Sequence, residues 1–122
     1  MPDYIPIYKP GNDITLTVGA TPVVGGNLVA LSAANTVIPT TGATAAWLGV
    51  ATQDAAVGAK VGVTSGGVQE LVAGGAIAVG AMVIPAAGGK VVTVGAGTFG
   101  QNVGIAMTVA ADGDKIRVKM AR

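Results

Sequence analysis

The chain carries one segment twice, and this internal repeat constrains its fold more than any other feature of the sequence. Residues 49–63 and 104–118 align over fifteen positions, of which seven are identical and two exchange valine for isoleucine. The identical pairs are Gly49/Gly104, Ala51/Ala106, Ala55/Ala110, Ala56/Ala111, Gly58/Gly113, Lys60/Lys115 and Val63/Val118. Continued upstream without a gap, the same offset of 55 residues pairs Leu16 with Leu71, Val24-Gly25 with Val79-Gly80, Val29 with Ile84 and Val37 with Val92. The repeated positions are turn and packing residues with no reactive side chain, which points to a scaffold.

Turn signals return every 8–12 residues from Asp13 onward, a spacing typical of an all-β sandwich or barrel. The β-branched and apolar runs between them are 14–18, 28–31, 47–52, 60–64, 68–72, 82–84, 90–94, 103–108 and 115–120. The repeated Ala-Ala-x-Gly-x-Lys element is interpreted as a tight turn in which Gly58 and Gly113 supply positive φ, with a short helical turn as the alternative. We therefore expect one all-β domain over residues 14–122, built as a small barrel or sandwich from related halves 14–63 and 69–118.

The first thirteen residues differ from the rest because they hold three prolines, which disfavour a helix and favour an extended path. Tyr4, Ile5, Ile7 and Tyr8 also make this segment strongly apolar. We predict that residues 1–13 form an extended arm that contacts another subunit. A frayed terminus is the alternative.

The apolar content of 51% is mostly alanine and valine, whose small side chains each remove little area from water. Twenty glycines add to the conformational entropy that is lost on folding. We therefore expect apolar surface to be buried between subunits, where association stabilises the fold by mass action. A tightly packed monomer remains the alternative.

The chain lacks the residues that several classes of chemistry require. Without histidine or cysteine there is no Ser–His or Cys–His nucleophile and no His/Cys metal site. Asp112 and Asp114 are not followed by the further carboxylates of a calcium loop. The net charge of +1 gives no electrostatic case for nucleic acid or an anionic membrane. We predict a protein that is not an enzyme, with no catalytic residue, metal, cofactor or small-molecule substrate.

Membrane insertion and export are also not expected. The uncharged stretches 14–53 and 71–89 are interrupted by glycine and proline and are poor in leucine and phenylalanine, unlike a membrane-spanning helix. The start of the chain lacks the basic and apolar regions of a signal peptide.

Two further patterns have ordinary structural interpretations. Gly95-Ala-Gly97-Thr-Phe-Gly100 matches the dinucleotide-binding string G-x-G-x-x-G, but strand-like residues follow it instead of a helix, so we interpret it as a glycine-rich loop. Lys115, Arg117 and Lys119 alternate with apolar residues and give the last strand a basic face. This face suits a solvated edge strand that discourages aggregation; docking on an acidic protein surface is the alternative.

The repeated segment, read as G-V-A-x-x-D-A-A-x-G and G-I-A-x-x-x-A-A-x-G, resembles the capsid cement, or head decoration, proteins of tailed bacteriophages. The resemblance runs from Ile14 to Val118, is most specific over 49–58 and departs from the usual length at 32–47. It implies a small β protein that binds the outer face of an icosahedral shell, commonly as a trimer, and reinforces it against internal DNA pressure.

On this resemblance the expected partners are the major capsid protein and, in a homotrimer, the chain itself. The expected location is the outer capsid surface of the virion, after assembly in the host cytoplasm. The candidate capsid or subunit contacts are Tyr4, Ile5, Ile7, Tyr8, Trp47 and Phe99. Two rivals are a small binding or adhesion module of a phage tail or bacterial surface, and a left-handed β-helix acyltransferase. The acyltransferase would need a six-residue repeat and a histidine that this chain lacks.

Overall fold

The computed structural model describes residues 13–95 and 99–122, and almost all regular structure in this part of the chain is β. A closed barrel is formed by β1 (Ile14–Val18), β2 (Leu28–Ala33), β3 (Thr36–Pro39), β4 (Trp47–Ala51) and β5 (Lys60–Thr64). A second sheet is formed by β6 (Val68–Val72), β7 (Met82–Ala86), β8 (Lys90–Thr93), β9 (Gly104–Ala106) and β10 (Lys115–Met120). Two short 3-10 helices are η1 (Ala87–Gly89) and η2 (Phe99–Gln101). The predicted all-β class is confirmed.

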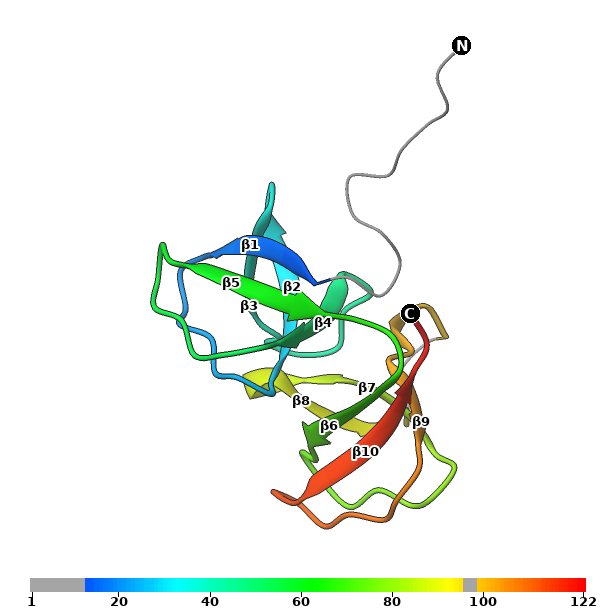
Figure 1. The fold of residues 1–122 in the computed structure, drawn as a ribbon. Helices are drawn as coiled ribbons and strands as arrows, with labels where there is room; N and C mark the ends of the chain where they lie inside the picture. The colour runs from blue at the N-terminus through cyan, green and yellow to red at the C-terminus, as the bar shows by residue number, and fades with distance from the viewer. Residues whose placement is uncertain (1–12, 96–98) are drawn as a thin grey trace.

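The barrel and the second sheet have the same strand order when the barrel is read around its closed circle from β1 through β5 and β4. The barrel runs β1-β3-β2-β4-β5 and closes between β1 and β5, while the sheet runs β6-β10-β9-β7-β8. Each strand of the sheet therefore has the neighbours of the barrel strand five places earlier, except that β6 and β8 lie at the two ends of the sheet whereas β1 and β3 are paired in the barrel (Figure 1). In the barrel, β1 and β3 pair in parallel at Thr17↔Thr36 and Val18↔Val37. In the sheet, one parallel bridge, Ala73↔Val91, joins the corresponding ends.

Matching backbone hydrogen bonds give the register between these two units and correct the ungapped sequence alignment. The amide of Gly58 donates to Val18 and that of Gly113 to Ala73, each pair 55 residues apart. By contrast, the amide of Thr40 donates to Leu28 and that of Val94 to Met82, which is an offset of 54. The offset is again 55 at Gly49 and Gly104, where a side-chain Cβ would meet the carbonyl of Thr64 or Lys119.

The predicted pairing of Leu16 with Leu71 is confirmed, because Leu16↔Val61 and Leu71↔Ile116 match at an offset of 55, but the pairings predicted between residues 24 and 37 were wrong by one residue. The cross-strand pairs Leu31↔Val37 and Pro85↔Val91 match Val37 with Val91, not with Val92. On the same offset Val29 corresponds to Val83, not Ile84. The missing residue lies in the turn after β6. Val23 and Ile77 begin matching bridges, and Gly19 and Gly74 match as well. Val23 follows Gly19 by four residues, whereas Ile77 follows Gly74 by only three. Losing a residue from a turn costs less stability than losing one from a strand, because a one-residue shift within a strand would move every side chain to the opposite face of the sheet.

Strand β3 is the element that the sequence pattern missed. It is four residues long, ends at a proline and follows a turn in which Asn35 has φ of 52°. Its length and its proline hide the alternation that identifies longer strands.

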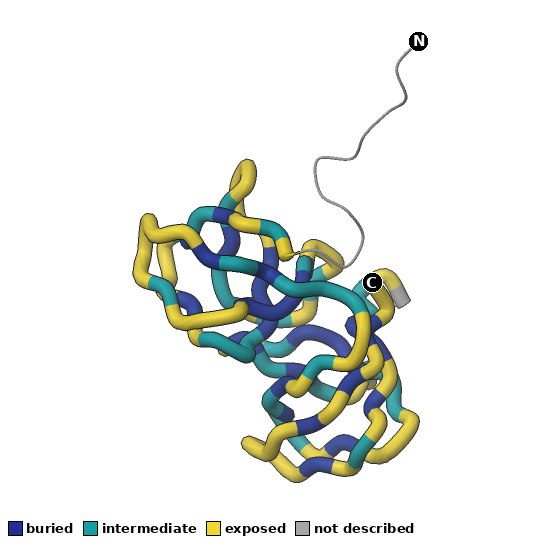
Figure 2. The backbone as a smooth tube through the Cα atoms, viewed as in Figure 1, coloured by how far each residue is buried: buried dark blue, intermediate teal, exposed yellow. Residues whose placement is uncertain are grey.

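Two clusters of buried side chains form the core. One lies inside the barrel and comprises Leu16, Val18, Val23, Val29, Val37, Ala51, Val61 and Val63. The other fills the second sheet and also includes three barrel residues, Leu28, Trp47 and Val50. Figure 2 shows buried stretches along the strands and exposed ones along the outer turns. The barrel therefore completes the core of the second sheet.

Strand β10 alternates as predicted, with Ile116, Val118 and Met120 buried and the intervening cations exposed. It is not an edge strand, because it pairs with β6 on one side and β9 on the other. The interpretation of this strand as a solvated edge was therefore wrong. Only the strand order, which long-range pairing determines, places it inside the sheet.

Candidate interaction surfaces

The junction between barrel and second sheet is built around Trp47, the only tryptophan in the chain. Its side chain is 1% exposed and belongs to the core of the second sheet. Arg122, just beyond β10, covers the ring with its guanidinium carbon 4.4 Å from the ring centroid. The same guanidinium donates to the carbonyls of Ala45 at 2.7 Å and Trp47 at 3.0 Å. These hydrogen bonds join residues that are 75 and 77 positions apart in the chain, and they hold the barrel against the second sheet.

A second set of contacts joins the opposite part of the junction. Thr40 is 1% exposed, and its hydroxyl donates to the carbonyl of Ala86 at 2.7 Å. The amide of Gly89 donates back to the carbonyl of Thr40 at 3.2 Å. The amide group of Asn27 donates to the carbonyl of Gly88 at 3.3 Å. The turn between β7 and β8 is therefore held directly against the barrel.

Of the candidate contact residues, the structure describes the side chain of Trp47 alone. Tyr4, Ile5, Ile7 and Tyr8 lie outside the described residues, as does the side chain of Phe99, whose backbone begins η2. Trp47 is described, and its buried indole packs within the chain. A contact of Trp47 with another protein stays a prediction. No local pattern marks this aromatic as an internal residue, because Ala45-Ala46 before it and Leu48 after it fit either environment.

Gly58 and Gly113 occupy corresponding turns. Their φ angles are +82° and +86°, in the region that side chains rarely adopt. In each turn the residue after the glycine donates back to an alanine: Ala59 to Ala56 and Asp114 to Ala111, both at 3.0 Å. Each of these hydrogen bonds joins residues three positions apart, so the two segments are turns and not helical segments.

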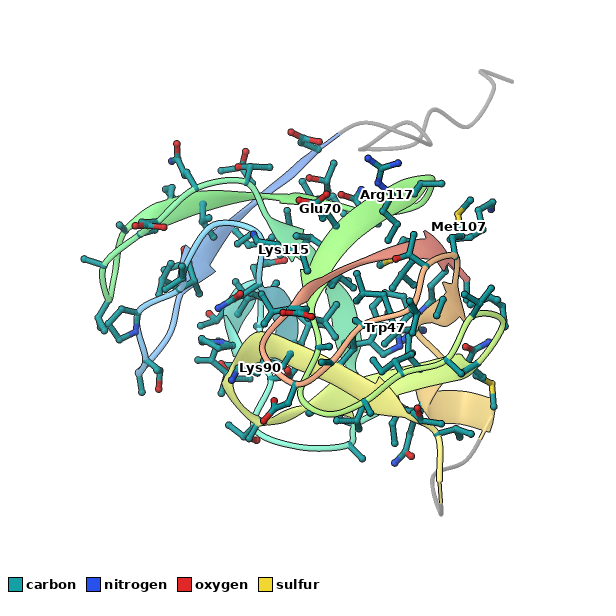
Figure 3. The ribbon with its side chains drawn as sticks, turned by 90° about the horizontal axis from the view of Figure 1, so that it is seen from below. Trp47, Glu70, Lys90, Met107, Lys115 and Arg117 are labelled. Atoms are coloured by element: carbon teal, nitrogen blue, oxygen red, sulfur yellow. The ribbon has the colours of Figure 1, made fainter. Side chains whose placement is uncertain are left out.

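The outer face of β10 is the main cationic surface of the described residues. Lys115, Arg117 and Lys119 are all exposed on it. Arg117 lies 4.0 Å from Glu70 on β6, and both side chains are largely exposed (Figure 3). The matching face of β5 carries Lys60, Gly62 and Thr64 instead. The barrel therefore lacks this row of positive charge.

Exposed apolar side chains concentrate on and beside the second sheet. Ile105 and Met107 are 44% and 51% exposed, and Val68 on β6 is 50% exposed. Lys119 is the register partner of both Val68 and Ile105, and Ile105 is in turn paired with Met82. These four residues form one row across β6, β10, β9 and β7. The outer face of the second sheet is thus a mixed basic and apolar surface, of the composition that often marks a protein contact.

Nothing in the described residues forms an obvious chemical centre. They contain no group of three or more acidic, histidine or cysteine side chains that would hold a metal. A shallow depression of about 290 Å³ is bordered by Gly100, Asn102, Ala121 and Arg122. The glycine-rich string before it leads into a three-residue 3-10 helix. None of the helices in the described part is long and apolar enough to span a membrane.

These features define the class: a β scaffold of two matched five-stranded units with a buried junction and an exposed basic and apolar face. Residues 8–121 match the phage cement protein family, and the chain belongs to that family. It is a capsid-associated structural protein. No curated protein matches the chain. Its structure is similar to the crystal structure of the head fibre gp8.5 N base of bacteriophage phi29, with a TM-score of 0.72, 18% identity, and coverage of 90% of this chain and 93% of that one. At this identity the likeness shows the fold.

Proposed function

We propose that this protein binds the outer surface of an assembled phage capsid and cements the shell against the internal pressure of DNA. The observation that carries the proposal is the family match over residues 8–121, which includes both five-stranded units. The partner is the major capsid protein. The protein acts on the outer surface of the virion, which it joins during assembly in the host cytoplasm.

The basic and apolar face of the second sheet is suited to such a contact. Arg117 is 67% exposed at its side chain, and Lys119 lies between the exposed Val68 and Ile105. Lys115 is turned toward the barrel: its Nζ lies 3.9 Å from where a Cβ on Gly26 would be. Arg117 and Lys119 are therefore the cations most available to an acidic surface of the shell.

Self-association into a homotrimer is the second part of the proposal. It is supported by the exposed apolar row on the second sheet. The arm at residues 1–13, with Tyr4, Ile5, Ile7 and Tyr8, would add contacts to a neighbouring subunit by pairing with an exposed strand.

Capsids that lack the protein provide the test. Purified protein is added to them, and its co-sedimentation with the particles is measured together with the temperature at which the particles release DNA. We expect saturable binding to intact shells and a higher release temperature. Binding to isolated tails in place of capsids, or bound protein that leaves the release temperature unchanged, would contradict the proposed role.

A further inference from the structure

Two adjacent loops of the second unit carry three strongly exposed apolar side chains. The loop from β6 to β7 holds Val79, which is 66% exposed. The loop from β9 to β10 holds Met107 and Val109, which are 51% and 72% exposed. The bridge Ile77↔Ala110 joins the two loops, and both run along the end of the second sheet that lies away from the barrel (Figure 1). We call Val79, Met107 and Val109 the apolar tip.

Val79 corresponds to Gly25 of the barrel. Its turn is closed by a hydrogen bond from the amide of Ala81 to the carbonyl of Ala78, and each of these residues lies 54 positions after its counterpart in the matching barrel turn. A Cβ on Gly25 would lie 3.0 Å from the Cα of Gln53. The barrel turn is therefore too close to its neighbouring loop for a side chain, whereas the second unit holds an exposed valine at this position.

Thr52 and Asp54 of the barrel correspond to Met107 and Val109, at the offset of 55. The carboxylate of Asp54 accepts a hydrogen bond from the amide of Gly25 at 2.8 Å, and the hydroxyl of Thr52 donates to a carbonyl 3.1 Å away. Valine and methionine can make neither bond, and such bonds contribute about 0.5–1.5 kcal/mol each. The second unit thus gives up local stabilisation and exposes apolar surface at the same positions. Its loops do not need the apolar tip in order to fold.

Arg117 borders the apolar tip. The amide of Met107 donates to the carbonyl of Arg117 at 2.8 Å, and the side chain of Arg117 is 67% exposed. At the other end of the same loop, the carboxylate of Asp114 accepts a hydrogen bond from the amide of Ala111. Methionine and arginine are enriched in protein interfaces, and several exposed apolar residues on adjacent loops are typical of a contact surface.

We propose that the apolar tip inserts into an apolar hollow on the outer surface of the capsid shell, and that Arg117 meets a carboxylate at the rim of this hollow. The inference rests on the proposed function and names the part of the chain that enters the shell. A second copy of the chain does not offer such a hollow, because its depression beside Asn102 is bordered by Arg122. Docking there would bring Arg117 of one copy toward Arg122 of the other, and like charges oppose this contact.

The test transfers the barrel residues to the second unit of the full chain. A triple variant combines Val79→Gly, Met107→Thr and Val109→Asp. Each new residue is the one that the barrel holds on a matching backbone, which favours a folded protein. Val109→Asp alone is a second variant for the same comparison. A double variant with Met107→Leu and Val109→Ile keeps the tip apolar.

Two substitutions in the barrel are matched controls. Val57→Asp removes a valine that is 56% exposed and adds the same charge as Val109→Asp, in a turn where the second unit already has Asp112. Val24→Ala removes a valine that is 52% exposed and introduces the residue that the second unit has there, Ala78. Circular dichroism checks the fold of every variant. Co-sedimentation with capsids that lack the protein measures the dissociation constant at low and at high salt.

We expect the triple variant to fold and its dissociation constant for capsids to rise about tenfold or more, as loss of a central apolar contact does. The loss should persist at high salt, because salt screens charges but does not weaken an apolar contact. Val109→Asp alone should weaken binding in the same direction. The apolar double variant and both barrel controls should bind like the wild type.

A folded triple variant that binds capsids as tightly as the wild type would overturn the inference, and so would a loss that disappears at high salt. Equal weakening by the barrel controls would also overturn it. Sedimentation velocity follows self-association in parallel: a variant that loses self-association but keeps its capsid affinity would assign the tip to a second copy instead. A wild type that does not bind capsids contradicts the proposed function itself, whereas a wild type and a triple variant that bind equally contradict this inference alone.

Discussion

The guanidinium of Arg122 stacks on the indole of Trp47, with 4.4 Å between its central carbon and the ring centroid. Trp47 begins β4 of the barrel, and Arg122 follows β10 of the second sheet. The carbonyl of Arg122 also accepts a hydrogen bond from the amide of Gly66, in the segment that connects β5 to β6. One residue therefore joins the barrel, the connection and the second sheet, and the indole is sealed from solvent beneath it.

Arg122→Ala removes the stacked cation and the two hydrogen bonds to Ala45 and Trp47. We expect the free energy of unfolding to fall by about 1–3 kcal/mol, because hydrogen bonds from a charged donor and a cation over an indole contribute on this scale. Urea unfolding followed by the fluorescence of Trp47 measures the change. Arg117→Ala is the matched control and should cost no more than about 0.5 kcal/mol, since its ion pair with Glu70 is exposed. Equal effects of the two substitutions would show that the junction does not depend on Arg122.

Gly104→Ala and Gly113→Ala separate crowding from backbone strain. A Cβ on Gly104 would lie 2.8 Å from Cγ1 of Val118 and would meet the carbonyl of Lys119, whereas one on Gly113 has open space around it. We expect Gly104→Ala to lower the free energy of unfolding by about 2–4 kcal/mol. Gly113→Ala should cost about 1–2 kcal/mol, because only the left-handed backbone opposes it. Thermal and denaturant unfolding test the order; the reverse order would mean that β9 and β10 approach less closely than described.

Reversing the charge of Arg117 and Lys119 together should weaken capsid binding. Both cations are exposed on the second sheet and are suited to an acidic surface of the shell. We expect the affinity for capsids to fall at low salt and the difference from the wild type to shrink as salt increases, because screening removes the attraction. Co-sedimentation at several salt concentrations measures this. Lys60→Glu in the barrel is the control, and an equal loss with that variant would show a general effect of net charge.

Deleting residues 2–9 tests the arm, which lies outside the described residues. These eight residues reach roughly 26–29 Å when extended at about 3.3–3.6 Å each, enough to cross onto a neighbouring subunit. We expect a nearly unchanged circular dichroism spectrum and strongly reduced capsid occupancy, because the described units contain both core clusters without the arm. Capsid binding as tight as that of the full chain would make the segment an ordinary tail.

Most of the β architecture could be predicted because its signals are local. Glycines such as Gly58 and Gly113 mark turns by the backbone angles that they permit, and alternation identified β1, β5, β6 and β10 at their observed bounds. The short β3 and the one-residue shift of the repeat were not predicted. Neither leaves a local pattern, since both depend on which strands pair across the barrel.

The sequence by itself determined the class of fold, the repeated unit and the family, because turn chemistry and side-chain alternation are written into neighbouring residues. Only the tertiary structure decided which copy of a repeated surface is buried. Leu28 and Val50 resemble Met82 and Ile105 in chemistry, yet the first pair packs against the second sheet and the second pair faces solvent. Trp47 likewise became an internal residue because β10 brings Arg122 and the core of the second sheet against it. Burial depends on what packs across a surface, and that is a property of the assembled chain.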